Sequence, residues 1–275
     1  MSAEELEYYA QAGRLTSYDD DVLAAEIDAA ARVVQGVVLH EGWASRYGVD
    51  VPADRRDEIQ LRSAADIVRR IRALDPAPLD QARPPERRLF GNCRTFATLT
   101  TAVLRKHGVS ARARAGFGTY FGEASHFIDH WIVEHWDANA ERWVRSDTQL
   151  DELQRQALRL IFQPLDVPSG RFLSGGEAWQ LCRSGGADPA MFGIAEWWGA
   201  WFIRNNVVRD LAALNKVELL PWDACGLMGR DSALGEGPSD DLVDQVAALT
   251  VDGDWCTLRS LYEADDRLRA PATFG

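Results

Sequence analysis

Hydrophobic residues in the first hundred positions recur at steps of three and four, a spacing that is typical of amphipathic helices. We expect such helices over residues 19–40, about 57–74 and 93–107. Residues 75–88 separate the second helix from the third and carry four prolines and several charges. This composition predicts an exposed connector.

Beyond the third helix the pattern changes to alternation between apolar and polar positions, rich in aromatic and β-branched residues. This pattern predicts strands at 110–121, 127–136 and 142–146, with a hairpin turn at 137–141. From about residue 150 onward the pattern is again mostly helical. Helices that flank one short antiparallel sheet indicate an α+β fold.

The charge balance disfavours two classes of partner. Thirty Lys and Arg stand against 42 Asp and Glu, a net charge of −12, which repels phosphate backbones and anionic membrane surfaces.

Phe192–Ile203 is the most apolar long stretch, but it has only twelve residues and includes Glu196. It is too short to span a membrane and predicts a buried helix. The acidic N-terminus has no signal-peptide pattern, and the four cysteines are far apart, so we expect a cytoplasmic protein with reduced thiols.

The strongest candidate for chemistry is Cys93, at the start of the third predicted helix. Either Gly91 or Asn92 can cap this helix, which places Cys93 in its first turn. Unpaired backbone N–H groups and the positive end of the helix stabilise a thiolate there. Cys93 is therefore a candidate nucleophile, and a small buried hydrophobe is the alternative. The other cysteines, Cys182, Cys225 and Cys256, have no partner pattern and are expected to be structural.

Two further residues could complete a catalytic set with Cys93. His130 lies on the strand at 127–136, and Asp147 follows the next strand. Asp147 could accept a hydrogen bond from the second ring nitrogen of His130 and so fix its tautomer. The order Cys, His, Asp corresponds to a nucleophile, a base and an orienting carboxylate.

Taken together, these segments resemble the transglutaminase-like superfamily of papain-related thiol enzymes. The resemblance covers roughly residues 88–150 and rests on GNCRTFATLTTAVLRKHGVSARARAGF, on HWIVE from His130 and on WVRSD ending at Asp147. It implies that Cys93 is the nucleophile, His130 the general base and acid, and Asp147 the orienting carboxylate. Trp131 directly after His130, and Thr148 after Asp147, depart from the family pattern.

The resemblance also implies a fold and a reaction. The fold would be α+β, with a papain/transglutaminase-like core in which the Cys-bearing helix packs on an antiparallel sheet. Residues 1–87 would form a helical N-terminal extension, 88–150 the catalytic core, and 151–275 a mainly helical C-terminal extension packed on the core. The reaction would be acyl transfer from an amide or thioester through a thioacyl intermediate, ending in hydrolysis or transamidation. The substrate would be a small molecule, a peptide or a carrier-bound acyl group, with no cofactor, no metal, no nucleic acid and no membrane.

Two other functions remain open. A non-catalytic binding or scaffold protein could retain the same fold. A zinc-dependent hydrolase would use His126 and His130, but alternation along a strand places them about 13 Å apart, and no H-E-x-x-H motif is present. Glu134 shares a strand face with His130 and could lie beside the site or in solvent. Arg112 and Arg114 could recognise an acidic group of a substrate, but a solvated strand face is the favoured interpretation.

Overall fold

We describe the protein from a computed structural model, which places residues 2–20, 24–122, 125–229 and 240–272. The chain divides into two units: a first formed by residues 1–113 and 132–167, and a second formed by residues 114–131 and 168–275. Each unit is therefore built from two stretches of sequence. Strands β3 (Ala111–Gly118) and β4 (Phe127–Asp137) contribute residues to both units.

The first unit is mainly helical. Its helices are α1 (Ala3–Ala10), α2 (Ile27–Val37), α3 (Ala64–Leu74), α4 (Cys93–Lys106) and α5 (Glu152–Leu158), with 3-10 helices η1 (Glu41–Tyr47), η2 (Ala53–Gln60) and η3 (Pro85–Arg87). Its short strands are β1 (Val38–His40), β2 (Leu89–Gly91) and β5 (Arg142–Ser146). β1 and β2 pair in parallel, and β5 runs antiparallel to the C-terminal half of β4.

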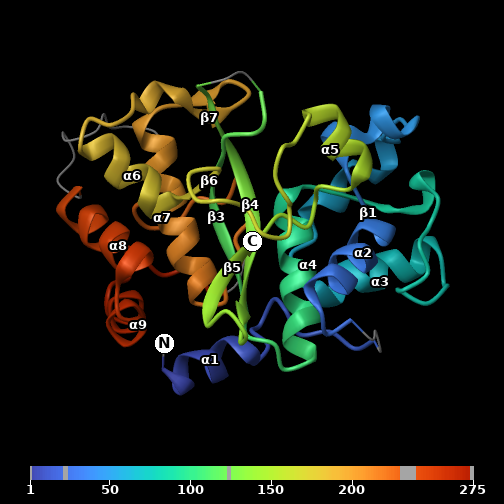
Figure 1. Cartoon of the computed structure of the whole chain (residues 1–275), viewed down its shortest axis with the longest axis horizontal. Coiled ribbons are helices and arrows are strands. Elements are labelled where there is room, and N and C mark those ends of the chain that lie inside the picture. The colour runs from blue at the N-terminus through green and yellow to red at the C-terminus, as the bar shows by residue number, and fades with distance from the viewer. Residues whose placement is uncertain (1, 21–23, 123–124, 230–239, 273–275) are drawn as a thin grey trace. The chain divides into compact units, whose positions relative to one another are not determined.

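Helix α4 forms the core of the first unit. Every residue from Cys93 to Arg105 is buried, and only Lys106 at the C-terminal end is exposed. The helix packs against α1, α2 and α3 and against the β1–β2 pair, as Figure 1 shows for α2 and α3. A helix that is covered on all sides is held rigidly, so its first residue has a defined position.

The second unit combines a mixed sheet with a group of helices. Its strands follow the order β6-β3-β4-β7-β8, where β6 is Phe172–Ser174, β7 Phe192–Ile194 and β8 Trp197–Trp198. β7 runs parallel to β4, whereas β6 is antiparallel to β3 and β8 to β7. Its helices are α6 (Gly175–Arg183), α7 (Ala200–Leu214), α8 (Asp240–Asp252), α9 (Trp255–Ala264) and the 3-10 helix η4 (Pro189–Met191).

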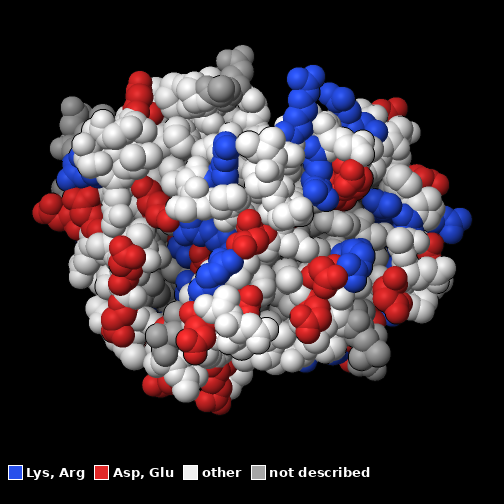
Figure 2. Space-filling model, viewed as in Figure 1, with Lys and Arg blue, Asp and Glu red and all other residues white. Residues whose placement is uncertain are grey.

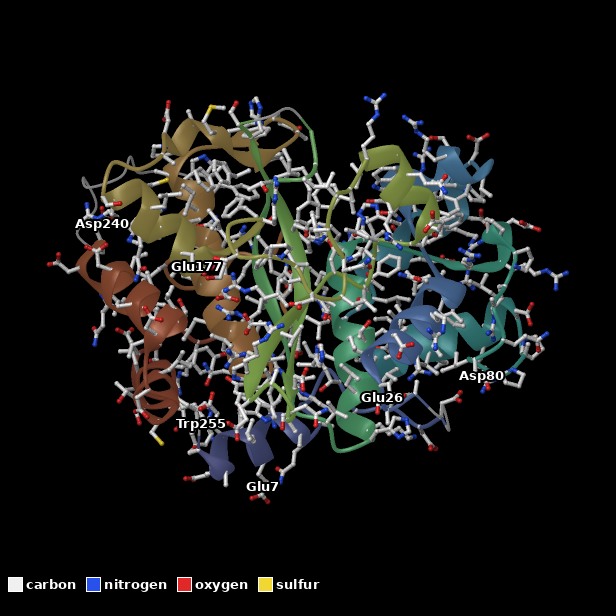
Figure 3. The ribbon with its side chains drawn as sticks, viewed as in Figure 1. Glu7, Glu26, Asp80, Glu177, Asp240 and Trp255 are labelled. Carbon is white, nitrogen blue, oxygen red and sulfur yellow. The ribbon has the colours of Figure 1, made fainter. Side chains whose placement is uncertain are left out.

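The start of α6 shows why two glycines stand together there. A Cβ on Gly175 would collide with the backbone of Asn206 in α7, and one on Gly176 would collide with Thr250 and Ala247 in α8. Only glycine permits this close approach of three helices. Glu177, labelled in Figure 3 at this end of α6, accepts a hydrogen bond from the backbone N–H of Ser174 at 2.7 Å and completes a capping box.

The α+β class is confirmed, and the helix at 93–107 and the three strands that follow it lie almost where the pattern places them. The pair of β4 and β7 makes the sheet mixed rather than purely antiparallel. Phe192–Ile203 is not one helix, because it forms β7, β8 and only the first turn of α7.

Three boundaries in the first unit also differ from the predictions. The helix expected over 19–40 is α2, which begins only at Ile27 and gives way to β1, while residues 21–23 of that prediction lie outside the described part of the chain. The helix expected over 57–74 is two elements, because Ser63 caps a new helix, α3, by accepting from the N–H of Asp66 at 3.0 Å. The connector at 75–88 is not fully exposed, since Leu79 and Arg83 are buried.

Among the described residues, no helix is both long and apolar enough to cross a membrane. On the face that Figure 2 shows, acidic side chains lie among basic ones.

Candidate functional site

Cys93 is the first residue of α4, and the helix cap that precedes it is fully formed. The Oδ1 of Asn92 accepts from the N–H of Thr95 at 3.1 Å, and the Oγ1 of Thr95 accepts from the N–H of Asn92 at 3.2 Å. A Cβ on Gly91 would lie less than 3.1 Å from the side chain of Thr95, so glycine is required beside this cap. Cys93 itself is 8% exposed. Its position in the first turn, predicted from the sequence, is confirmed.

A buried ionic network holds the chain just before Cys93. Glu58 receives hydrogen bonds from Arg55 at 2.7 Å, from Arg70 at 2.8 Å and from the backbone N–H of Phe90 at 2.8 Å. The next residue after Cys93, Arg94, is fully buried and donates to the carbonyls at positions 61 and 62. The segment that presents the thiol is therefore anchored on both sides by charge-assisted hydrogen bonds.

Asp147 follows β5 in the same unit as Cys93 and is completely buried. Its backbone N–H donates to the carbonyl of Pro164 at 2.7 Å, and its Oδ1 accepts from the N–H of Gln149 at 3.2 Å. The neighbouring Thr148 makes a hydroxyl–hydroxyl hydrogen bond of 2.9 Å with Thr100 of α4. The structure therefore brings the segment that carries Asp147 against the helix that carries Cys93.

His130 lies on β4 and belongs to the second unit. Its side chain is buried, with the ring of Phe121 at 4.6 Å and the ring of Tyr120 at 6.0 Å between centroids. These aromatic contacts restrict the orientation of the imidazole. Because Cys93 and Asp147 belong to the other unit, the association of the three side chains is a proposal, which we develop below.

The sequence analysis predicted a solvated face for charged residues on the strands, but these residues do not face solvent. Glu134 is buried and accepts hydrogen bonds from Arg112 at 2.7 Å and Arg145 at 3.1 Å. Arg114 is buried as well and pairs with Asp210 of α7 at 2.8 Å. The expectation of a solvated strand face for the arginines is therefore wrong, and so is the solvent-exposed position considered for Glu134, since ion pairs bury these groups. The alternative, that Glu134 lies beside the site, stays a prediction.

Two of the remaining cysteines are disfavoured as nucleophiles by burial. Burial raises the pKa of the Cys182 thiol to about 11, which disfavours its thiolate, and burial also raises the pKa of Cys225. His107 accepts from the N–H of Ala24, and His40 caps η1 by accepting from the N–H of Gly42. Within the described ranges, no group of three or more His, Cys, Asp or Glu residues could hold a metal ion.

The sequence analysis did not identify two groups that could take part in binding or catalysis. The Nδ2 of Asn92 is buried and has no hydrogen-bond partner in the described part of the chain. Asp129, next to His130 on β4, is buried at a pocket with Arg209 and Asn205 of α7. The four-residue step between Asn205 and Arg209 could have shown that they share a helix face, but not that Asp129 lies beside them.

Comparisons with curated proteins and with solved structures found no match. A comparison with protein-family models found one that matches residues 50–148, a stretch that includes Cys93, His130 and Asp147. That model describes the transglutaminase-like superfamily, and residues 50–148 are therefore similar to a transglutaminase-like core.

Proposed function

We propose that the protein is a thiol-dependent acyl-transfer enzyme in which Cys93 is the nucleophile, His130 the general acid and base, and Asp147 the group that orients His130. The similarity to a transglutaminase-like core indicates a cysteine-based thiol enzyme at the level of the superfamily. The observation that carries the proposal is the position of Cys93 inside the matched stretch, as the first residue of a capped and rigidly packed helix.

The proposed reaction has two steps. The Sγ of Cys93 attacks the carbonyl carbon of an amide or thioester, and the bond from that carbon to nitrogen or sulfur breaks while His130 donates a proton to the leaving group. A thioacyl intermediate remains on Cys93. Water or an amine then loses a proton to His130 and attacks the thioester, which releases Cys93 and gives the acid or a new amide. We expect the acyl donor to be a small molecule, a peptide or a carrier-bound acyl group.

The tetrahedral intermediate needs two hydrogen-bond donors for its oxyanion. The backbone N–H of Cys93 can supply one, because the first N–H groups of a helix have no partner within the helix. Asn92 offers the other: its Oδ1 is fixed in the cap by Thr95, and its buried Nδ2 has no acceptor among the described residues. We propose that this amide turns to donate to the substrate oxygen when the tetrahedral intermediate forms.

The role of Asn92 can be separated from its role as a cap. Asn92→Ser retains a good N-cap residue but removes the amide donor, so we expect the free energy of unfolding to change by less than about 1 kcal/mol. The rate of Cys93 acylation should fall by about 10²–10³-fold, as for loss of one oxyanion donor. Alkylation of Cys93 by iodoacetamide forms no oxyanion and should be unchanged. Loss of alkylation together with acylation would show instead that the substitution has displaced the thiol.

The central experiment is intact-mass spectrometry of the full chain after exposure to an activated acetyl ester and an acetyl thioester. The wild-type protein should gain one acetyl group more than Cys93→Ala, and peptide mapping should place that group on Cys93. Cys182→Ala is the matched control and should be acetylated like the wild type, since the raised pKa of Cys182 keeps that thiol protonated.

Two results would contradict the proposal. Equal acetylation of the wild type and of Cys93→Ala would place the nucleophile elsewhere. Absence of any adduct, combined with alkylation of Cys93 no faster than that of a free cysteine, would favour the binding or scaffold protein that retains this fold.

A further inference from the structure

The second unit contains a pocket of about 260 Å³ that the proposed acyl transfer does not use. Helix α7 contributes one face of it, because Trp201, Asn205 and Arg209 follow one another at steps of four residues. The rest of the lining comes from the ends of strands and from the segment after α7, at Asp129, Ile194, Trp197, Pro221, Trp222, Ala224 and Gly229, with Phe202 beside Trp201.

Aromatic side chains form the walls of this pocket. The rings of Trp197 and Trp201 lie edge to face at 6.1 Å, and those of Trp201 and Phe202 at 5.3 Å. Trp222 is 44% exposed and Ile194 42% exposed, which is unusual for large apolar side chains in the described structure. Exposed apolar groups that gather around a concavity mark a binding surface.

The floor of the pocket is polar and buried. Arg209 donates from Nη1 to the Oδ1 of Asn206 at 3.1 Å and from Nη2 to the carbonyl of Asp223 at 3.1 Å. Its Nε is buried and has no acceptor in the described ranges. Asp129, which also lines the pocket, accepts a hydrogen bond from the Nδ2 of Asn206 at 2.7 Å.

The charges at the floor decide the kind of ligand. Asp129 and Arg209 interact electrostatically, and burial raises the pKa of Asp129 while it lowers the pKa of Arg209. Asp129 and Asp223 therefore both offset the charge of Arg209, and a ligand with a net charge would bring a further charge into a buried site. The guanidinium of Arg209 lines the pocket, and an uncharged ligand can accept a hydrogen bond from it through a carbonyl oxygen.

The volume of the pocket limits the size of its ligand, and its position separates it from His130. A cavity of about 150 Å³ lined by apolar groups accommodates benzene, so 260 Å³ leaves room for one aromatic ring with a polar substituent. Asp129 and His130 are successive residues of β4, and successive side chains of a strand point to opposite faces. The pocket therefore lies on the face of β4 opposite the one that carries His130.

We propose that this pocket is a second binding site, which holds an uncharged aromatic ring with a hydrogen-bond acceptor between Trp197, Trp201 and Trp222, the acceptor facing the guanidinium of Arg209. This site is independent of the proposed acyl transfer. It would bind its ligand even in a protein whose Cys93 has been replaced.

The test is isothermal titration of the full chain with four probes of similar size: benzamide, benzoate, benzylamine and ethylbenzene. Benzamide should bind best. Ethylbenzene has no acceptor and should bind about threefold to tenfold more weakly, as for one lost hydrogen bond. Benzoate and benzylamine each bring a charge into the site and should bind at least about tenfold more weakly. The same order should hold for Cys93→Ala.

A pair of tryptophan variants locates the binding. Trp222→Ala removes a partly exposed wall of the pocket and should weaken benzamide binding by about tenfold. Trp43→Ala, in η1 of the first unit, is the matched control and should bind like the wild type; circular dichroism checks that both variants are folded. Tighter binding of either charged probe would overturn the charge argument. If the two substitutions weaken benzamide binding equally, or if none of the four probes shows saturable binding, the proposal of a binding site in this pocket is overturned.

Discussion

Replacing Asp210 with alanine is expected to lower the free energy of unfolding by about 3–5 kcal/mol, the cost of leaving a buried charge without its partner. Asp210 of α7 receives two hydrogen bonds from the guanidinium of Arg114, at 2.9 and 2.8 Å, and a third from the N–H of Ala115 at 3.0 Å. The side chains of Arg114 and Asp210 are 3% and 0% exposed, so water cannot replace the lost carboxylate. Urea unfolding of the full chain, followed by circular dichroism, measures the change.

The control for this prediction is an ion pair of the same unit that faces solvent. Arg259 and Glu263 of α9 pair at 2.8 Å, with the Glu263 side chain 63% exposed. Glu263→Ala should therefore cost less than about 1 kcal/mol. A second variant that replaces both buried partners, Arg114→Met with Asp210→Leu, should recover much of the lost stability, because no charge then remains buried. A cost for Asp210→Ala no larger than that for Glu263→Ala would show that the buried pair contributes little.

The region around the proposed nucleophile was predictable because its signals are local. The cap at Asn92, the apolar spacing of α4 and the alternation of β3, β4 and β5 all lie within a few residues of the elements they define. Local propensity and pattern agree there, as they do in segments that fold with little frustration. The roles of Cys93, His130 and Asp147, and the division of the chain at 87 and 150, remain predictions.

The features that were predicted wrongly depend on contacts between distant residues. Asp20 lies inside the helix predicted over 19–40, but it precedes α2 in the structure and its carboxylate pairs with Arg72 at 2.7 Å. Arg114 and Asp210 are 96 residues apart in the chain, and no spacing rule connects them. A charged residue on a strand is usually assigned to solvent, and only the tertiary structure shows that its partner lies in the core.

The aromatic pocket was also not predictable from the sequence, because it depends on local turns of the backbone. The apolar stretch Phe192–Ile203, which holds Trp197 and Trp201, predicts one buried helix. In the structure, the left-handed backbone at Ala195 and the glycine at 199, with φ of 51° and 113°, turn the chain from β7 through β8 into α7. These turns bring Trp197 and Trp201 to the rim of one pocket instead of placing them on successive turns of a single helix.

Replacing His130 with alanine is expected to reduce the rate of Cys93 acylation by about 10²–10⁴-fold, the usual contribution of a general acid and base. The imidazole packs on Phe121 at 4.6 Å, so its removal leaves a space of matching shape beside that ring. Imidazole added to the solution should therefore restore part of the activity of His130→Ala. The measurement is the rate at which the acetyl thioester acetylates the full chain, followed by intact mass with and without imidazole.

A histidine of the same strand provides the control, because it shares the residue type but not the strand face. His135 lies five positions beyond His130 and so points to the other side of β4, near the hydroxyl of Ser146 at 3.3 Å. Burial lowers the pKa of His135 and so favours its neutral form. We therefore expect His135 to have a structural role. His135→Ala should change the acylation rate by less than about twofold and should not respond to imidazole. If imidazole fails to restore His130→Ala while that variant remains folded, His130 supports the strand and does not transfer the proton, since only a lost proton carrier can be replaced from solution.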